Sequence, residues 1–260
     1  MVVWEHRRLI RSMVRRDILS RYQGSFAGAL WTFINPLLLM LTYAFVFGVV
    51  MQSRFPGDSS KSGFVLYLLA GLLPWWAFSE AVGRSPHVIL EHRNFVKKLR
   101  FPLETLPVNL VLAGLVTEAI GLGVFLIGIG AIRHTLPTEI GWLAAILVPQ
   151  VALTVGLCWF LSALGVYMRD LSQIMGFVLN LWFYLTPICY PESQLPANAL
   201  GVLRWNPMLP LVRAYRDVLL ENRAPDMIGL GIWFIGAIAL AILAFVWFQD
   251  RKSTRLNSSH

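Results

Sequence analysis

The sequence predicts an all-α membrane protein with six transmembrane helices. Its 260 residues are 57% hydrophobic and 14% charged, with a mean hydropathy of +0.62, so the chain has too little polar surface to cover a soluble globule of this size. Apolar runs of about 20 residues, the length that crosses the hydrocarbon core as a helix, recur along it. The net charge of +8 comes from basic residues gathered at the ends of these runs, so it does not indicate a nucleic-acid partner.

Six apolar runs define the expected spans. They lie near residues 29–51, 63–83, 105–130, 140–166, 171–190 and 227–249. Prolines fall within or at the ends of four of them, where they predict kinks or breaks, because neighbouring groups can satisfy the freed backbone. These prolines are Pro36, Pro107, Pro149 and Pro187. We expect one membrane domain over residues 1–249, with any energy-coupling machinery on another chain.

The distribution of Lys and Arg predicts the orientation in the membrane. The segments assigned to the inner side carry 15 of the 22 basic residues and the outer segments carry 7. Cytoplasmic flanks retain positive charge during insertion, so both termini are expected in the cytoplasm. The polar tail, residues 250–260, differs from the rest of the chain and is interpreted as an expression or assembly artefact. Without its three charges the count is still 12 to 7.

The first charged stretch, residues 4–22, predicts an amphipathic helix on the inner leaflet. Leu9, Met13 and either Ile10 or Ile18 fall near one helical face. The basic residues lie mostly elsewhere on the helix: Arg7, Arg8, Arg11, Arg15 and Arg16. A purely positive anchor that fixes topology is the alternative, and the two interpretations are compatible.

Two loops are unusual for a membrane protein. Residues 84–102 are too polar to span and too long for a tight turn. They form either a short helix that docks a cytoplasmic partner or a solvated basic loop that touches anionic lipid. Residues 191–225 carry five prolines between apolar stretches too short to cross. We expect short helices that dip back into the outer leaflet as an outer gate, or else an amphipathic cap on the bundle.

The chain carries little that could support catalysis. Glu118 is nearly the only acid inside a span; it could contact a sugar hydroxyl or a proton, or be paired or protonated between helices. The five histidines show no HExxH spacing, Cys158 and Cys189 show no metal-ligand spacing, and GxxxxGK[ST] does not occur. We therefore expect no metal, no cofactor, no nucleotide site and no catalytic residues in this chain.

Aromatic residues make up 13% of the chain, with ten tryptophans. Most are expected to form interfacial belts. Aromatic faces also stack on sugar rings, so a subset could line a substrate channel. The channel candidates, with Glu118, are Tyr43, Phe47, Trp182, Tyr184 and Tyr190.

Several long segments resemble one family. They are RRDILSRYQGSFAGALWTFINPLLLMLTYAFVF from Arg15, LLPWWAFSEAV at 72–82, NFVKKLRFPLETLPV at 94–108, MRDLSQIMGFVLNLWFYLTPICYP at 168–191 and NPMLPLVRAYRDVLL at 206–220. In this order they are similar to the ABC-2-type polysaccharide export permeases, which export O-antigen, capsule and teichoic acid chains. The likeness covers nearly the whole chain, from about residue 5 to 249. The polar tail departs from the family's usual ending.

The resemblance implies a homodimer in the bacterial inner membrane, joined to two P-loop ATPase subunits that hold ATP and Mg. A channel along the subunit interface would pass an undecaprenyl-linked polysaccharide, with O-antigen favoured, among membrane lipids. Residues 4–22 match the interface helix and 191–225 the periplasmic gate helices. The 84–102 loop matches the coupling helix that sits in the ATPase, with contacts expected from Glu91, Arg93, Asn94, Phe95, Lys97, Lys98 and Arg100.

Three other functions share some of these sequence features. An ABC-2 exporter of a small molecule or lipo-oligosaccharide would share the helix count and coupling. A membrane-embedded transferase on lipid-linked sugars would need a cluster of carboxylates or histidines at a loop face, which the sequence does not supply. A secondary transporter would normally show internal repeats or several midplane ionisable residues, and neither is evident.

Overall fold

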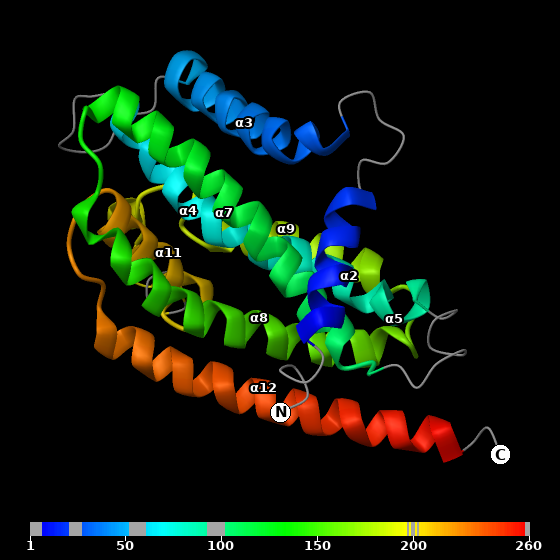
Figure 1. The fold of residues 1–260 in the computed structure, drawn as a ribbon. Helices are drawn as coiled ribbons and strands as arrows, with labels where there is room; N and C mark the ends of the chain where they lie inside the picture. The colour runs from blue at the N-terminus through cyan, green and yellow to red at the C-terminus, as the bar shows by residue number, and fades with distance from the viewer. Residues whose placement is uncertain are drawn as a thin grey trace.

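The computed structural model describes residues 7–20, 28–51, 61–92, 102–196, 198, 201 and 203–257, and all regular structure in them is helical (Figure 1). The all-α prediction is therefore confirmed for this part of the chain. The main helices are α2 (Arg7–Ser20), α3 (Trp31–Tyr43, continued by a π-helix over Ala44–Val50), α4 (Lys61–Arg84), α5 (Val88–Glu91), α7 (Thr105–Arg133), α8 (Leu143–Gly165), α9 (Leu171–Leu185), α11 (Met208–Leu219) and α12 (Met227–Asn257).

Among the described residues, five helical segments are long and apolar enough to cross a membrane. They are Trp31–Val50, Gly63–Glu91, Thr105–Arg133, Thr138–Gly165 and Met227–Asp250. Each overlaps one of the six predicted apolar runs. The sixth run forms a shorter apolar helix, α9.

α9 has 15 residues, so it is about 22 Å long at 1.5 Å per residue, short of the roughly 30 Å hydrocarbon core. It ends where Thr186 takes an extended conformation, with φ −93° and ψ 130°. Pro187 explains this end, because the residue before a proline is pushed out of the helical region. The helix ends at Leu185, so the last five residues of the predicted span 171–190 are not helical. The predicted break at Pro187 is present.

The other prolines do not interrupt their helices. Pro36 and Pro149 lie inside α3 and α8, which continue through them as helix. Pro107 lies in the first turn of α7, where a backbone N–H has no intrahelical acceptor anyway. At these three positions the helix is not broken, and the expected kinks stay a prediction.

α4 is the central helix of the bundle. In Figure 1 it runs alongside α7, with α11 against one end and α12 lying along α8. In the most apolar 18-residue stretch of the α4 segment, 78% of the stretch is buried inside the subunit. The corresponding share is 11% for Trp31–Val50 and 17% for Met227–Asp250. α3 and α12 therefore leave most of their apolar surface uncovered within a single subunit.

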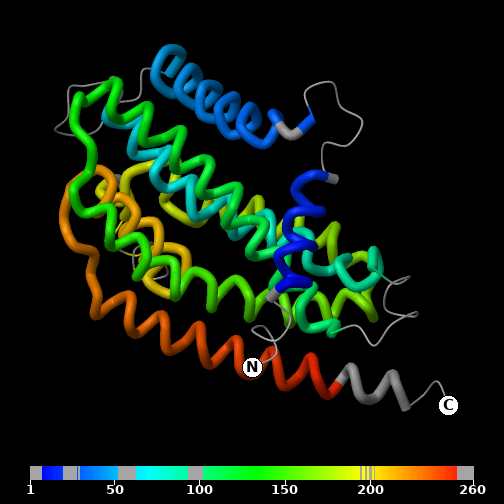
Figure 2. The backbone as a smooth tube through the Cα atoms, viewed as in Figure 1, coloured from blue at the N-terminus to red at the C-terminus, as the bar shows by residue number. Residues whose placement is uncertain are grey.

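The two ends of the bundle differ in their connections (Figure 2). The links from α7 to α8 and from α11 to α12 lie at one end, whereas α2, α5 and the link from α8 to α9 lie at the other. The second group contains segments that the charge count assigns to the inner side. The relative placement of these segments thus agrees with the predicted topology.

At the end of the bundle that carries α2 and α5, α8 packs closely against the turn that follows α4. Gly165, the last residue of α8, faces the short 3₁₀ turn Ser85–His87 that follows α4. A Cβ at Gly165 would overlap the backbone carbonyl of Pro86, which cannot move as a flexible side chain would. A glycine is therefore required here for α8 to pack against this turn.

Candidate functional site

Four of the predicted channel residues lie near one another. Tyr43 of α3 stacks on Phe47 with ring centroids 6.2 Å apart, and Phe47 contacts Phe64 of α4 at 5.8 Å. Tyr184 of α9 is 66% exposed, and its carbonyl accepts a hydrogen bond from the Tyr190 hydroxyl at 2.9 Å. The Tyr43 side chain lies near that of Tyr184. α3 and the end of α9 thus share an aromatic surface.

Trp182, the fifth aromatic candidate, faces the interior of the subunit. Its ring packs edge-on against Phe78 at 5.2 Å and Trp75 at 6.3 Å, both from α4. Its Nε1 donates a hydrogen bond to Asn206 Oδ1 at 2.9 Å. These contacts give Trp182 a positioning role between α9 and the segment before α11, behind the aromatic surface.

α9 has one buried and one exposed face. Leu171, Met175 and Leu179 are buried. The opposite face carries Gln173, Ile174, Phe177, Asn180, Leu181 and Tyr184, all exposed. An amide placed in hydrocarbon without a partner costs several kcal/mol. Because Asn180 has no hydrogen-bond partner within the described part of the subunit, this face is suited to another protein chain or to water.

α12 presents the opposite kind of surface. Between Ile228 and Val246 its large exposed side chains are aliphatic: Ile228, Ile232, Ile235, Ile238, Ile242, Leu243 and Val246. Residues 227–248 contain no charged, amide or hydroxyl side chain. This composition matches lipid acyl chains, which offer no hydrogen bonds. The exposed faces of α9 and α12 therefore differ in the surroundings that they can tolerate.

Glu118 was predicted to line the channel, but it is buried inside the subunit. It is 5% exposed and accepts hydrogen bonds from Gln150 Nε2 at 2.7 Å and from the Tyr215 hydroxyl. Gln150 Oε1 lies 3.0 Å from the same hydroxyl oxygen. The carboxyl group is thus held between helices, as the alternative interpretation expected, and it joins α7, α8 and α11.

Arg216 is a second buried polar group on α11. It is 3% exposed, its guanidinium lies 3.3 Å from the centroid of the Tyr67 ring, and it donates to the carbonyls of Tyr67 at 3.2 Å and Ile188 at 3.0 Å. Its Nη1 has no hydrogen-bond partner within the described residues. A Cβ at Gly71 would come within 2.9 Å of Arg216 Nη2, so the small residue on α4 makes room for the guanidinium.

Asn206 connects the end of α9 to the start of α11. Its Oδ1 accepts from Trp182 Nε1 and, at 3.0 Å, from the backbone N–H of Met208. Its Nδ2 donates to Thr186 Oγ1 at 2.9 Å. One amide side chain thereby satisfies an N–H at the start of α11 and holds the turn that follows α9.

Ion pairs secure the remainder of the predicted gate segment 191–225. Arg213 of α11 binds the Glu192 carboxylate, with Nε 2.9 Å from Oε1, and this hydrogen bonding raises the pKa of the arginine. Arg223 pairs with Asp217 at 2.6 Å. α11, with 12 residues, is too short to cross a bilayer and packs against α4 and α8. A short helix is thus present in this segment, while its re-entry into the outer leaflet stays a prediction.

The predicted coupling segment is described only at its edges. α5 carries Glu91, which is exposed. The other predicted contact residues, Arg93, Asn94, Phe95, Lys97, Lys98 and Arg100, lie outside the described residues. A short helix was one of the two interpretations of the 84–102 loop, and its described part contains the helical turn Val88–Glu91. The middle of the loop lies outside the described residues.

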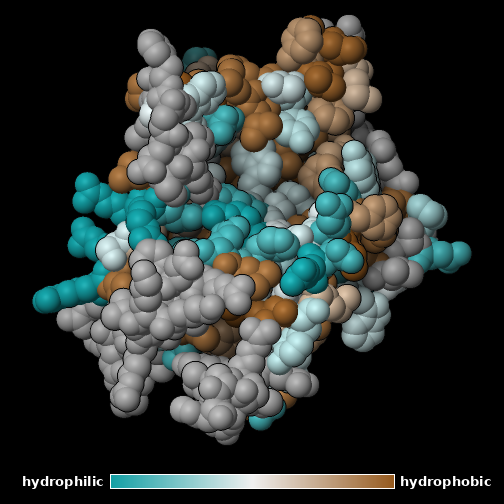
Figure 3. Space-filling view, turned by 90° about the vertical axis from the view of Figure 1, so that its right-hand side faces the viewer, coloured by the Kyte–Doolittle hydropathy of each residue, from teal (hydrophilic) through white to brown (hydrophobic). Residues whose placement is uncertain are grey.

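α2 is helical and amphipathic, as predicted. Ile10 and Met13 are buried, whereas Leu9 and Ile18 are half-buried, so Ile10 is the residue that shares the covered face with Met13. The arginines Arg8, Arg11, Arg15 and Arg16 are exposed, and Arg7 is the first helical residue. Figure 3 faces this end of the molecule and shows hydrophilic side chains gathered in a band between hydrophobic surfaces.

Arg84 and Asp17 form a contact that sequence reasoning did not identify. Arg84, at the end of α4, donates to both Asp17 carboxylate oxygens, at 2.8 and 3.0 Å. The pair anchors α2 to the bundle. Gln150 and Tyr215 were also missed, although a glutamine inside an apolar run is itself a signal of a buried polar contact.

Comparison with known proteins gives consistent relatives over almost the whole chain. The family model described as ABC-2 type transporter matches residues 8–220. The O-antigen export system permease protein RfbA of Myxococcus xanthus is 34% identical, covering 96% of this chain and 95% of that protein. RfbA of Klebsiella pneumoniae is 27% identical over 94% and 92%. The polysialic acid transport protein KpsM of Escherichia coli is 21% identical over 96% and 95%.

Proposed function

Because this chain belongs to the ABC-2 type transporter family, we propose that it is the membrane-spanning subunit of an ATP-driven exporter of a lipid-linked polysaccharide, with O-antigen as its cargo. The observation that carries this proposal is the 34% identity to an O-antigen export permease over 96% of the chain. The chain is a multi-pass protein of the inner membrane, and both termini lie in the cytoplasm on this proposal.

Two copies of the chain form the channel between their α3 and α9 faces. The support for this is the exposed strip on α9, where Asn180 and Tyr184 lie among apolar side chains. Such a surface is costly against lipid but suits a second subunit or a hydrated sugar chain. Exposed aromatic rings such as Tyr184 offer stacking faces to sugars without selecting one glycan.

Coupling to the ATPase takes place at residues 84–102. Two separate P-loop subunits dock at this segment, and the ATP and Mg are bound within those subunits. This chain contributes no catalytic residue and holds no cofactor. The supporting observation is that α5 and α2 lie at the same end of the bundle, the end that carries the inner-side segments (Figure 1). Movement of this loop would reach the core directly, because the turn Ser85–His87 packs against α8.

The segment around α11 forms the outer gate. α11 rests on the membrane helices through the Glu118–Gln150–Tyr215 cluster and through Arg216. Asn206 links α11 to the end of α9, which bears the proposed channel face. A shift of α9 during transport would therefore be transmitted to the gate.

Export of a small molecule or lipo-oligosaccharide remains the alternative within the family, and a transferase acting on lipid-linked sugars is the alternative from another class. A deletion strain separates them. Loss of the gene should remove the surface polysaccharide while undecaprenyl-linked glycan accumulates at the inner leaflet. Unchanged surface polysaccharide, or chemical modification of the glycan by the purified chain without an ATPase, would count against the export proposal.

A further inference from the structure

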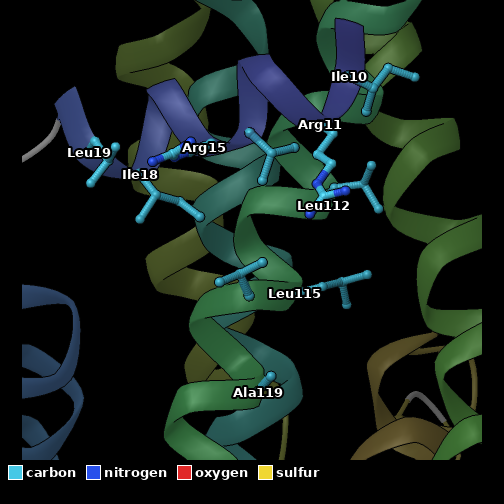
Figure 4. A pocket seen from close by; sticks show the side chains of 10 residues that line it. Ile10, Arg11, Arg15, Ile18, Leu19, Leu112, Leu115 and Ala119 are labelled. Carbon is cyan, nitrogen blue, oxygen red and sulfur yellow. The ribbon is translucent and has the colours of Figure 1, made fainter. Parts of the chain in front are cut away.

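An open groove separates α2 from α7 at the arginine-bearing end of the bundle (Figure 4). It has a volume of about 820 Å³. Its walls are apolar side chains of both helices, among them Ile18, Leu115, Val116 and Ala119, and Arg11 and Arg15 stand at its α2 edge. In Figure 4 the Arg11 side chain extends from α2 toward Leu112. One end of the groove is therefore cationic and the rest is hydrocarbon-like.

The two arginines are free to bind an anion. Within the described part of the chain, neither Arg11 nor Arg15 makes an ion pair or hydrogen bond, and both are exposed. The one acid in α2, Asp17, is held by both nitrogens of Arg84 and does not neutralise them. Arg8 adds a third exposed charge along the same edge.

The depth of the groove matches the inner leaflet. α7 has 29 residues, so it is about 43 Å long and extends beyond a hydrocarbon core of roughly 30 Å. At 1.5 Å per residue, Leu112 and Ala119 lie about 10 Å and 21 Å from Thr105. If α7 is centred in the bilayer, these side chains reach from about 4 Å inside the hydrocarbon edge to the bilayer midplane, which is the depth of one leaflet. The arginines of α2 then lie at headgroup level.

We propose that the α2–α7 groove is a binding site for one anionic phospholipid, whose phosphate contacts Arg11 and Arg15 and whose acyl chain lies along Leu115, Val116 and Ala119. The charge at the edge and the apolar walls match the two halves of such a lipid. The bound lipid completes the contact between α2 and the bundle. The inference rests on the inner-side position of α2, which belongs to the proposed function, but its test needs neither orientation nor transport.

Native mass spectrometry of the purified, detergent-solubilised protein, titrated with phosphatidylglycerol or phosphatidylcholine, tests the site. The wild type should retain one phosphatidylglycerol per subunit and bind it at least about tenfold more tightly than phosphatidylcholine, since each arginine near a lipid headgroup contributes appreciably to anion binding. Arg11→Gln combined with Arg15→Gln should abolish this preference. Arg169→Gln, an exposed arginine in the α8–α9 link outside the groove, should keep it.

A second variant probes the apolar part. Ala119→Phe places a ring in the groove and should weaken binding of both lipids without changing the oligomeric state. Unaltered phosphatidylglycerol binding in the double arginine variant would overturn the proposal, as would equal affinity for the two lipids. A disulfide formed through Ala119→Cys between two copies of the chain would show that a second subunit occupies the groove. None of these results bears on polysaccharide export, which the deletion strain measures separately.

Discussion

The polar side chains behind α11 and those on the open face of α9 have opposite surroundings. Glu118, Gln150 and Tyr215 are sealed between three helices and satisfy one another. Asn180, on α9, has no partner within the described residues of its own subunit. The first group holds three helices together, whereas the second is exposed on a short apolar helix and needs a partner outside the subunit. On the proposed function, the open face of α9 therefore has a role in the channel that the buried cluster does not share.

The largest contrast is expected from two Gly→Ala substitutions. Gly165→Ala forces the backbone of Pro86 to move and should lower the free energy of unfolding by about 3 kcal/mol, at the upper end for overpacking. Gly176→Ala, on the exposed side of α9 with nothing near its Cβ position, should be neutral or stabilising by up to about 1 kcal/mol. Thermal unfolding in detergent measures both, and equal destabilisation would contradict the contrast.

Two Tyr→Phe substitutions compare the loss of one hydroxyl group in the buried cluster with the same loss on the open face of α9. Tyr215→Phe removes the donor to the Glu118 carboxyl group and should cost about 2 kcal/mol, because a buried acceptor loses a partner. Tyr184→Phe removes a hydroxyl group from an exposed ring and should leave the unfolding temperature unchanged. If Tyr215→Phe is as stable as the wild type, the buried cluster does not hold α11.

The ion pair between α4 and α2 should contribute less. Arg84→Gln removes both hydrogen bonds to Asp17, but the pair is partly exposed, with side-chain exposures of 34% and 15%, so a loss of about 1 kcal/mol is expected. Hydrogen exchange should rise in residues 7–20 and not in α8. Arg169→Gln, which breaks no contact in the described residues, is the matched control.

The smallest stability effect is expected on the open face of α9. Asn180→Leu should change the unfolding free energy by less than about 0.5 kcal/mol, as for a surface substitution, yet export should fall severalfold if this face lines a hydrated channel. Ile235→Leu on α12 is the control for a lipid-facing position. Export is measured as surface polysaccharide per cell. Normal export by the Asn180→Leu variant would show that Asn180 does not line the channel.

Much of the fold was predictable because apolar runs of span length leave few alternatives. Five of the six predicted runs form helices long enough to cross, and residues 4–22 form the expected amphipathic helix over their described part. The length of α9 was misjudged because hydropathy continues past Leu185, whereas helix geometry stops at the Thr186–Pro187 bond. Run length alone does not include this backbone constraint.

The candidate site was less predictable, because residue type does not give side-chain direction. Tyr43, Phe47 and Tyr184 were chosen for their rings and do share a surface, but Trp182 and Glu118, chosen by the same reasoning, face inward. Their partners come from distant positions: Asn206 for Trp182, and Gln150 and Tyr215 for Glu118. Contacts across such separations depend on helix packing, which a local sequence pattern does not encode.

Cysteine cross-linking between two copies of the chain tests most directly that the α3–α9 face forms the subunit interface. With Cys158 and Cys189 replaced by alanine, Phe177→Cys on the exposed face of α9 should give a disulfide-linked dimer in membranes. Ile235→Cys, equally exposed at 71% but on α12, should remain monomeric on the same gel. A dimer formed through Ile235→Cys and not through Phe177→Cys would contradict the account and place the interface on the aliphatic face.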